Sequence, residues 1–85
     1  MASYRVLIKR SAVREIAAVP LKDRRRIVSR IEALGLDPRP AGVEKLSGDD
    51  KYRVRQGRYR ILYQIQDREL VVTVVKVGDR RDVYR

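Results

Sequence analysis

The sequence predicts a single domain of the α+β class, residues 1–85, in which a helical hairpin packs on one face of a mainly antiparallel four-stranded sheet. Three observations carry this prediction. Apolar residues alternate with a period of two between residues 52 and 66 and are nearly continuous from 70 to 77. They recur at helical spacing between 21 and 34. A chain of 85 residues also buries only one modest core.

The first part of the chain predicts a strand followed by two helices. Residues 4–9 alternate as a strand does, and Ser11 is a suitable cap for a short helix over about 12–19. Pro20 interrupts that helix, and a second helix follows over about 21–34 until Gly35. The expected buried stripes are Val13, Ile16 and Ala17 in the first helix and Ile27, Val28, Ile31 and Leu34 in the second.

The second part predicts a loop and then a three-stranded meander. Residues 35–50 are rich in Gly, Pro and Asp and are expected to form the loop. Residues 52–55 and 59–66 form strands around a tight turn at 56–58, and a third strand over 70–77 ends at Gly78. The order is therefore strand, helix, helix, strand, strand, strand, with the last strand in a central position of the sheet.

The charge composition indicates a phosphate-containing partner. The net charge is +10, and 16 of the 21 basic residues are arginine, whose planar guanidinium matches phosphate oxygens. Composition alone leaves a nucleic acid, an anionic membrane surface and an acidic protein open as partners. The chain has no His and no Cys, which excludes an imidazole base, a thiolate nucleophile and a zinc finger. We expect no metal and no cofactor.

The hydropathy pattern predicts a cytoplasmic protein without a membrane partner. The chain begins without a hydrophobic stretch of signal-peptide length. Its longest apolar run, residues 70–75, is far shorter than a membrane span.

Strand alternation predicts a basic face on the sheet. If the helices cover the Tyr, Ile and Val side, the opposite side carries Arg53, Arg55 and Arg60. Residues 51–60 contain no acidic residue and five basic ones: Lys51, Arg53, Arg55, Arg58 and Arg60. The C-terminal tail is expected to bring Arg80, Arg81 and Tyr84 toward the same face. An ordinary solvated sheet face is the alternative.

The residues of this face limit its possible chemistry. Without His, arginine and tyrosine are the remaining reactive groups. Surrounding guanidinium groups favour the phenolate form of a tyrosine, which could then take the proton of an RNA 2′-OH. A nearby arginine could stabilise the extra charge on the phosphorus in the transition state.

Four segments resemble the RelE/ParE toxin superfamily, and specifically its RelE-like mRNA interferase branch. They are residues 45–48, 52–55, 57–63 and 77–85, which together extend the resemblance over most of the chain. The resemblance implies the toxin of a type II toxin–antitoxin system, a ribosome-dependent endoribonuclease that cleaves mRNA by 2′-OH attack and inhibits translation. One departure is Ser47, where many relatives carry a basic residue; Lys51 or Arg58 could replace that phosphate contact.

The resemblance also assigns roles to the basic face. Arg60 is expected to stabilise transition-state charge, Arg80 to assist the leaving oxygen, and Tyr84 to act as the base. Arg53 and Arg55 are expected to bind RNA, with help from Lys51, Arg58 and Arg81. The implied partners are mRNA in the ribosomal A site, ribosomal RNA and a cognate acidic antitoxin, with oligomers arising mainly through the toxin–antitoxin complex.

Two other functions fit the same sequence. A ParE-like toxin on this fold inhibits DNA gyrase through protein contacts, although such chains tend to lack a tyrosine at the position of Tyr84. A non-catalytic module that binds RNA or an antitoxin is the third possibility.

Overall fold

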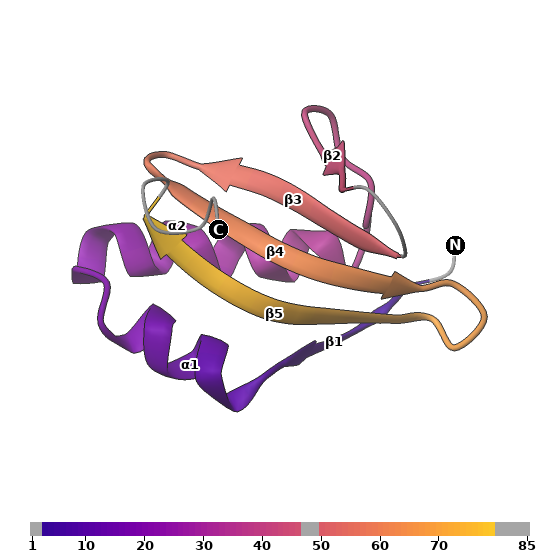
Figure 1. Cartoon of the computed structure of the whole chain (residues 1–85), viewed down its shortest axis with the longest axis horizontal. Coiled ribbons are helices and arrows are strands. Elements are labelled where there is room, and N and C mark those ends of the chain that lie inside the picture. The colour runs from indigo at the N-terminus through magenta and orange to yellow at the C-terminus, as the bar shows by residue number, and fades with distance from the viewer. Residues whose placement is uncertain (1–2, 47–49, 80–85) are drawn as a thin grey trace.

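The computed structural model describes residues 3–46 and 50–79 and confirms the α+β class. Two helices pack against one five-stranded sheet with the strand order β1-β5-β4-β3-β2 (Figure 1). β1 is parallel to β5, and the other neighbours are antiparallel. The elements are β1 (Arg5–Ile8), α1 (Arg10–Ala17), α2 (Leu21–Leu34), β2 (Glu44–Lys45), β3 (Lys51–Gln56), β4 (Tyr59–Gln66) and β5 (Val71–Asp79).

Three predicted details of the elements are wrong. The predicted loop over 35–50 contains the short strand β2, whose two residues pair with Arg53 and Tyr52 and raise the strand number from four to five. β5 continues through Gly78 to Asp79 because it still pairs with β4 there. α1 begins at Arg10 rather than after Ser11, since the chain turns directly from β1 into the helix while the Lys9 N–H donates to the Val74 carbonyl.

The helices bury one stripe each against the sheet, as expected. α2 buries Ile27, Ile31 and Leu34, but Val28 is 39% exposed and lies beside the stripe. In α1 the buried pair is Ala12 and Ile16, an i, i+4 spacing. Val13 and Ala17, both predicted as buried, are exposed, Val13 to 49%. From the sheet, the predicted Tyr, Ile and Val side forms the rest of the core: Tyr52, Val54, Ile61, Tyr63, Ile65, Val72, Val74 and Val77.

A β-bulge changes the alternation within β5. Leu62 pairs with Lys76, whereas the next residue of β4, Tyr63, pairs with Val74, so β5 has one extra residue at this point. Val74 and Val77 are three residues apart, yet both are buried in the core. The bulge therefore keeps the second half of β5 in phase with the core, and it places Gly78 opposite Arg60.

α1 closes the exposed edge of β5. β1 ends opposite Val74, while β5 continues to Asp79. One carboxylate oxygen of Glu15 in α1 accepts a hydrogen bond from the Val77 N–H at 2.8 Å, and the other contacts Lys76 Nζ at 3.1 Å. Such contacts satisfy an edge that would otherwise pair with another strand.

Gly35 is required where α2 ends against β1. Its carbonyl accepts the Tyr4 N–H at 2.7 Å. A Cβ at this position would lie 3.0 Å from the Tyr4 carbonyl oxygen and 3.1 Å from Val6 Cγ2. Because glycine has no side chain, the end of α2 and the start of β1 can approach each other closely.

Neither helix in the described part of the chain is long and apolar enough to cross a membrane.

Replacing Tyr63 with phenylalanine should destabilise the fold. Tyr63 is fully buried, and its hydroxyl donates to the Pro38 carbonyl at 2.7 Å. Burial raises the pKa of Tyr63 to about 12, so the hydroxyl keeps its proton as a donor. Tyr63→Phe leaves that carbonyl without its donor and should lower the free energy of unfolding by about 1–2 kcal/mol in denaturant titrations. Tyr59→Phe, at a half-buried position, is the matched control and should change it by less than about 0.5 kcal/mol.

Candidate functional site

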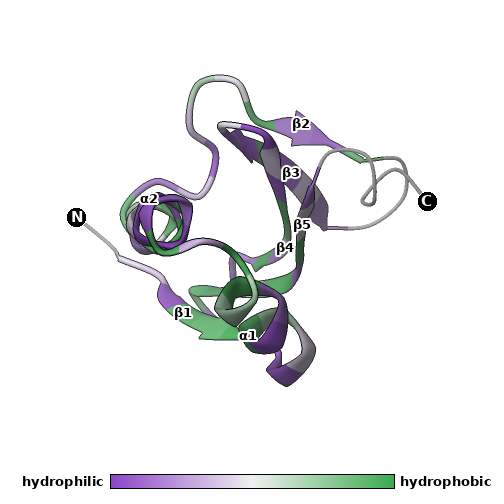
Figure 2. Cartoon of the chain, turned by 90° about the vertical axis from the view of Figure 1, so that its left-hand side faces the viewer, coloured by the Kyte–Doolittle hydropathy of each residue, from purple (hydrophilic) through white to green (hydrophobic). Residues whose placement is uncertain are grey.

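The register of the sheet places three predicted site residues on the face away from the helices. Figure 2 shows α1 and α2 on one side of the curved sheet. Arg60 on β4 lies between Arg55 on β3 and Gly78 on β5, and the next row places Arg53 beside Leu62. Because neighbours in register share a face, Arg53, Arg55 and Arg60 lie together opposite the core. We call this surface the open face.

Arg60 differs from its neighbours because it is buried. It is 2% exposed, whereas Arg55 and Lys51 are exposed to solvent. Arginine remains charged at all physiological pH values, so its burial carries a desolvation cost. Charge interactions at such a position are screened less than at an exposed one. Arg60 is therefore the residue of the open face best placed to act on a developing negative charge.

Arg53 is half-buried and held by an acidic neighbour. Its Nε and Nη2 atoms donate to Glu44 Oε1 at 3.1 and 2.9 Å. Glu44 comes from β2, which pairs with β3 at Arg53. The short strand missed in the sequence thus supplies a carboxylate to a predicted phosphate-binding residue. An incoming phosphate must compete with Glu44 for this guanidinium.

Arg58 holds the end of β5. Its Nε donates to Asp79 Oδ2 at 2.8 Å, and this hydrogen bond raises the Arg58 pKa. The contact joins the β3–β4 turn to the last described residue before the tail. Arg58 was predicted to bind RNA. The structure gives it a further role in positioning the end of β5.

Arg80, Arg81 and Tyr84 lie outside the described residues, and their roles stay predictions.

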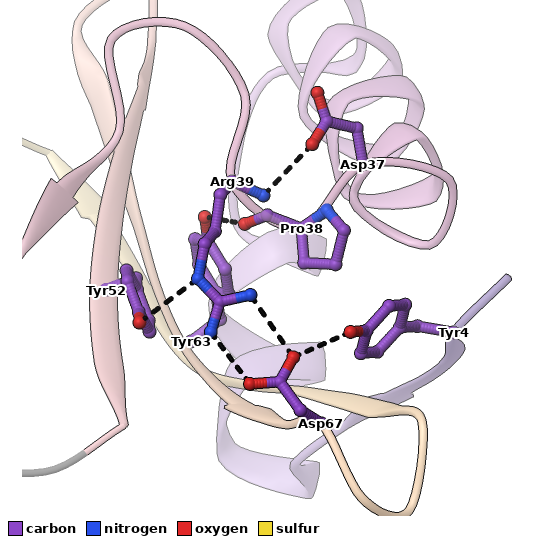
Figure 3. A network of polar contacts seen from close by, with 7 residues as sticks. All are labelled: Tyr4, Asp37, Pro38, Arg39, Tyr52, Tyr63 and Asp67. Carbon is purple, nitrogen blue, oxygen red and sulfur yellow. Dashed lines mark hydrogen bonds and ion pairs between the residues drawn. The ribbon is translucent and has the colours of Figure 1, made fainter. Parts of the chain in front are cut away.

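A second polar cluster lies at the other end of β4 (Figure 3). Arg39 and Asp67 form a two-point ion pair, with Nη1–Oδ1 and Nη2–Oδ2 distances of 3.1 and 2.9 Å. The Tyr4 hydroxyl donates to Asp67 at 2.6 Å, and Arg39 Nε donates to the Tyr52 hydroxyl at 3.3 Å. These contacts join the loop after α2 to the N-terminal segment, β3 and the β4–β5 turn, so the cluster is structural.

Arg24 also has a structural role. Its guanidinium donates to the Val19 carbonyl at 3.1 Å and to the Ala17 carbonyl at 3.2 Å. These carbonyls lie at the corner between α1 and α2, where helix ends leave acceptors free. Arg24 therefore fixes the corner between the helices.

Residues 3–46 and 50–79 contain no group of three or more His, Cys, Asp or Glu residues that could hold a metal ion.

Comparison with known proteins identifies the class. The family model for the ParE toxin of type II toxin–antitoxin systems, parDE, matches residues 4–84. The chain therefore belongs to this family, within the RelE/ParE superfamily predicted from the sequence.

The individual relatives are named as Rel toxins or as complexes of a Rel toxin with its antitoxin. The archaeal RelE–RelB complex from Pyrococcus horikoshii matches with a TM-score of 0.85 and 30% identity, over 95% of this chain and 99% of that chain. The RelBE2 toxin–antitoxin complex from Mycobacterium tuberculosis matches with a TM-score of 0.83 and 26% identity, over 96% and 97%. Toxin RelG of the same organism is 41% identical over 34 residues, 40% of this chain and 39% of that protein. The chain is a RelE-like toxin.

The Arg39–Asp67 pair predicts a pH dependence of stability. Hydrogen bonds from Arg39 and then Tyr4 lower the pKa of Asp67 to about 2. A carboxyl whose pKa is depressed by folding contributes stability above its unfolded value of about 4, and this contribution is lost as the pH falls toward 2. Asp67→Asn should therefore be less stable than the wild type at pH 6, with a difference that shrinks between pH 4 and 2.

Thermal unfolding followed by circular dichroism across this pH range measures that difference. Asp50→Asn removes one carboxylate from an exposed position that forms no described ion pair, and it is the control for net charge. A difference for Asp67→Asn that stays constant from pH 6 to pH 2 would contradict a role for the ionised carboxylate.

Proposed function

We propose that this RelE-like toxin is a metal-independent endoribonuclease that cleaves mRNA in the ribosomal A site and so inhibits translation. The observation that carries the proposal is the buried Arg60 on the open face, in register with Arg55 and Gly78. A fixed cation in a poorly solvated position suits a reaction in which negative charge grows on phosphorus. The RelE–RelB name of the Pyrococcus relative and the net charge of +10 support the same proposal.

The proposed reaction uses only groups of this chain and the RNA. The Tyr84 phenolate removes the proton of the 2′-OH, and the 2′ oxygen attacks the adjacent phosphorus. Arg60 stabilises the charge on the phosphoryl oxygens while the bond from phosphorus to the 5′ oxygen breaks. Arg80 stabilises the leaving 5′ oxygen, which takes a proton from solvent, while Tyr84 releases to solvent the proton it gained and returns to the phenolate form. The products are a 2′,3′-cyclic phosphate and a 5′-OH.

The remaining basic residues of the open face position the RNA. Lys51 and Arg55 are exposed and available to phosphate groups. Arg53 contributes once phosphate displaces Glu44 from its guanidinium. In this scheme Arg81 adds a contact from the tail, and Arg58 holds the end of β5 through Asp79. Residues that fix substrate geometry lower the barrier by removing the entropy cost of alignment.

We further propose that an acidic antitoxin neutralises this toxin in the cytoplasm. The Pyrococcus and Mycobacterium relatives are complexes of a toxin with a RelB-type antitoxin. A chain with a net charge of +10 attracts an acidic partner over a distance of about one Debye length, roughly 8 Å at physiological salt. Oligomers then form mainly through the toxin–antitoxin complex.

Mapping of mRNA 5′ ends in cells after induction of the toxin tests the nuclease. The expected result is a set of cuts within translated codons, because the ribosome presents the substrate. Tyr84→Phe should remove these cuts while ribosome binding stays near normal, since the substitution deletes only the proton carrier. Intact transcripts together with gyrase-linked DNA breaks would instead support the ParE-like gyrase inhibitor that the sequence leaves as an alternative.

Arg60→Ala should slow cleavage more than it weakens binding. If Arg60 acts like an oxyanion donor, its loss costs about 2–4 kcal/mol of transition-state stabilisation. Single-turnover cleavage of mRNA on purified ribosomes separates the rate from the affinity. Arg55→Ala, on the same face but exposed, is the matched control and should mainly weaken binding. Equal losses in rate and affinity for Arg60→Ala, with an unchanged melting temperature, would limit Arg60 to positioning.

A further inference from the structure

The end of β5 carries two parts of the proposed site. Its register with β4 places Gly78 opposite Arg60 on the open face. Arg80, which stabilises the leaving oxygen in the proposed reaction, comes directly after Asp79, the last residue of the strand. A shift of this strand end would therefore move Gly78, and the start of the segment that carries Arg80, relative to Arg60.

In the described part of the chain, this strand end has a neighbouring strand on one side only. β1 pairs with β5 from Val71 to Val74, whereas β4 pairs with it as far as Asp79. Among the described residues, 75–79 therefore have no strand on the side of β1. An edge of this kind leaves backbone groups without strand partners, and a segment with fewer such bonds opens more easily.

A carboxylate of α1 takes the place of a neighbouring strand. Glu15 Oε1 accepts a hydrogen bond from the Val77 N–H at 2.8 Å, and Oε2 contacts Lys76 Nζ at 3.1 Å. The hydrogen bond joins residues 62 positions apart in the sequence. Ile16, the next residue of α1, is buried in the core, so packing fixes the helix rotation that directs Glu15 at β5. The place of the strand end thus depends on α1.

A hollow lies beside Glu15 at this edge. Within the described residues it has a volume of about 330 Å³ and is lined by Glu15, Ala18, Val19, Tyr59 and residues 76–79. The side chains around a hollow make fewer packing contacts than those of a filled core. The edge at 76–79 is therefore held more by the polar contacts of Glu15 than by packing.

A second contact holds the same strand end from the side of β4. Arg58 Nε, in the turn between β3 and β4, donates to Asp79 Oδ2 at 2.8 Å. The side chain of Arg58 is 60% exposed, and exposed ion pairs contribute little because solvent screens them. Glu15 is half-buried, and a charged acceptor bonded to a backbone N–H makes a stronger contact. Glu15 is therefore the stronger of the two contacts.

We propose that Glu15 is a positioning residue for RNA cleavage, which acts by holding the end of β5 beside Arg60. The inference rests on the proposed function, because it assigns to Glu15 an effect on the rate of that reaction. α1 lies on the side of the sheet away from the open face, so Glu15 acts without touching the RNA (Figure 2). A displacement of about 1 Å at a reacting group can reduce a rate about 100-fold. Loss of Glu15 should therefore lower the rate of cleavage and leave the affinity for the substrate nearly unchanged.

Single-turnover cleavage of mRNA on purified ribosomes measures the rate and the affinity separately. Glu15→Ala should lower the rate by about 10- to 100-fold, with the affinity within about twofold of the wild type. Glu15→Gln keeps an oxygen acceptor for the Val77 N–H and should retain a rate within about threefold of the wild type. Glu15→Asp keeps the charge but is one methylene shorter, so its rate should fall below that of Glu15→Gln. Glu32→Ala, at an exposed position of α2 outside the described ion pairs, is the control for net charge.

Exchange of backbone amide hydrogens with solvent, measured by NMR on the full toxin chain, tests the contact without cleavage. Relative to the amide of Val72 in the core, the Val77 amide should exchange at least about tenfold faster in Glu15→Ala than in the wild type. Melting temperatures show whether each variant folds. Glu15→Gln and Glu15→Asp carry the test if Glu15→Ala does not fold.

The outcomes separate the role of Glu15 from the nuclease itself. Equal cleavage rates for the wild type and Glu15→Ala would overturn the positioning role and keep the nuclease. A faster rate for Glu15→Asp than for Glu15→Gln would overturn it as well, because charge would then matter more than the hydrogen bond. Equal losses of rate and affinity, or an unchanged exchange of the Val77 amide, would do the same. Absence of cleavage by the wild type, with faster Val77 exchange in Glu15→Ala, would reject the nuclease and its positioning residue together.

Discussion

The register between β4 and β5 is the constraint on which the rest of this structure depends. Without the bulge after Leu62, Val74 and Val77 would point to opposite faces of the sheet, because strands alternate with a period of two. With it, both valines enter the core, and Gly78 lies beside Arg60 on the open face. One extra residue thus allows a continuous core and a buried arginine to share the same pair of strands. The contacts at Val77 and Asp79 then hold the strand end in this register.

The basic side chains of this protein differ in whether they form an ion pair with a carboxylate. Arg39, Arg53 and Arg58 are each bound to an acidic side chain and join segments of the fold. The exposed arginines of α2, together with Lys51 and Arg55, have no such partner in the described ranges. The net charge of +10 therefore determines how strongly the whole molecule attracts anions at long range. The exposed basic side chains without a carboxylate partner are the ones to which an anion can bind directly.

Much of the fold could be predicted because its signals are local. The period-two pattern located β4, and helical spacing located α2, at the bounds that the structure shows. The predictions that are wrong concern elements whose bounds depend on contacts with distant parts of the chain. Nothing in residues 44 and 45 marks a strand, which exists through its pairing with β3. The start of α1 depends on a hydrogen bond from Lys9 to β5. The partners of Arg53 and Arg58 come from distant segments, so their structural roles could not be predicted from spacing.

The size of the domain bears on how the proposed reaction reaches its transition state. A core of this size supports one sheet and two helices, and in the described part of the chain both helices lie on the side of the sheet away from the open face. A site formed on one face of a sheet cannot by itself immobilise a flexible RNA strand from several sides, although alignment of the reacting atoms contributes much of the catalysis in such reactions. On the proposed function, the ribosome holds the mRNA in place, and the toxin adds a fixed cation and a base. The proposed cleavage is therefore expected to require a structure that has already ordered the RNA.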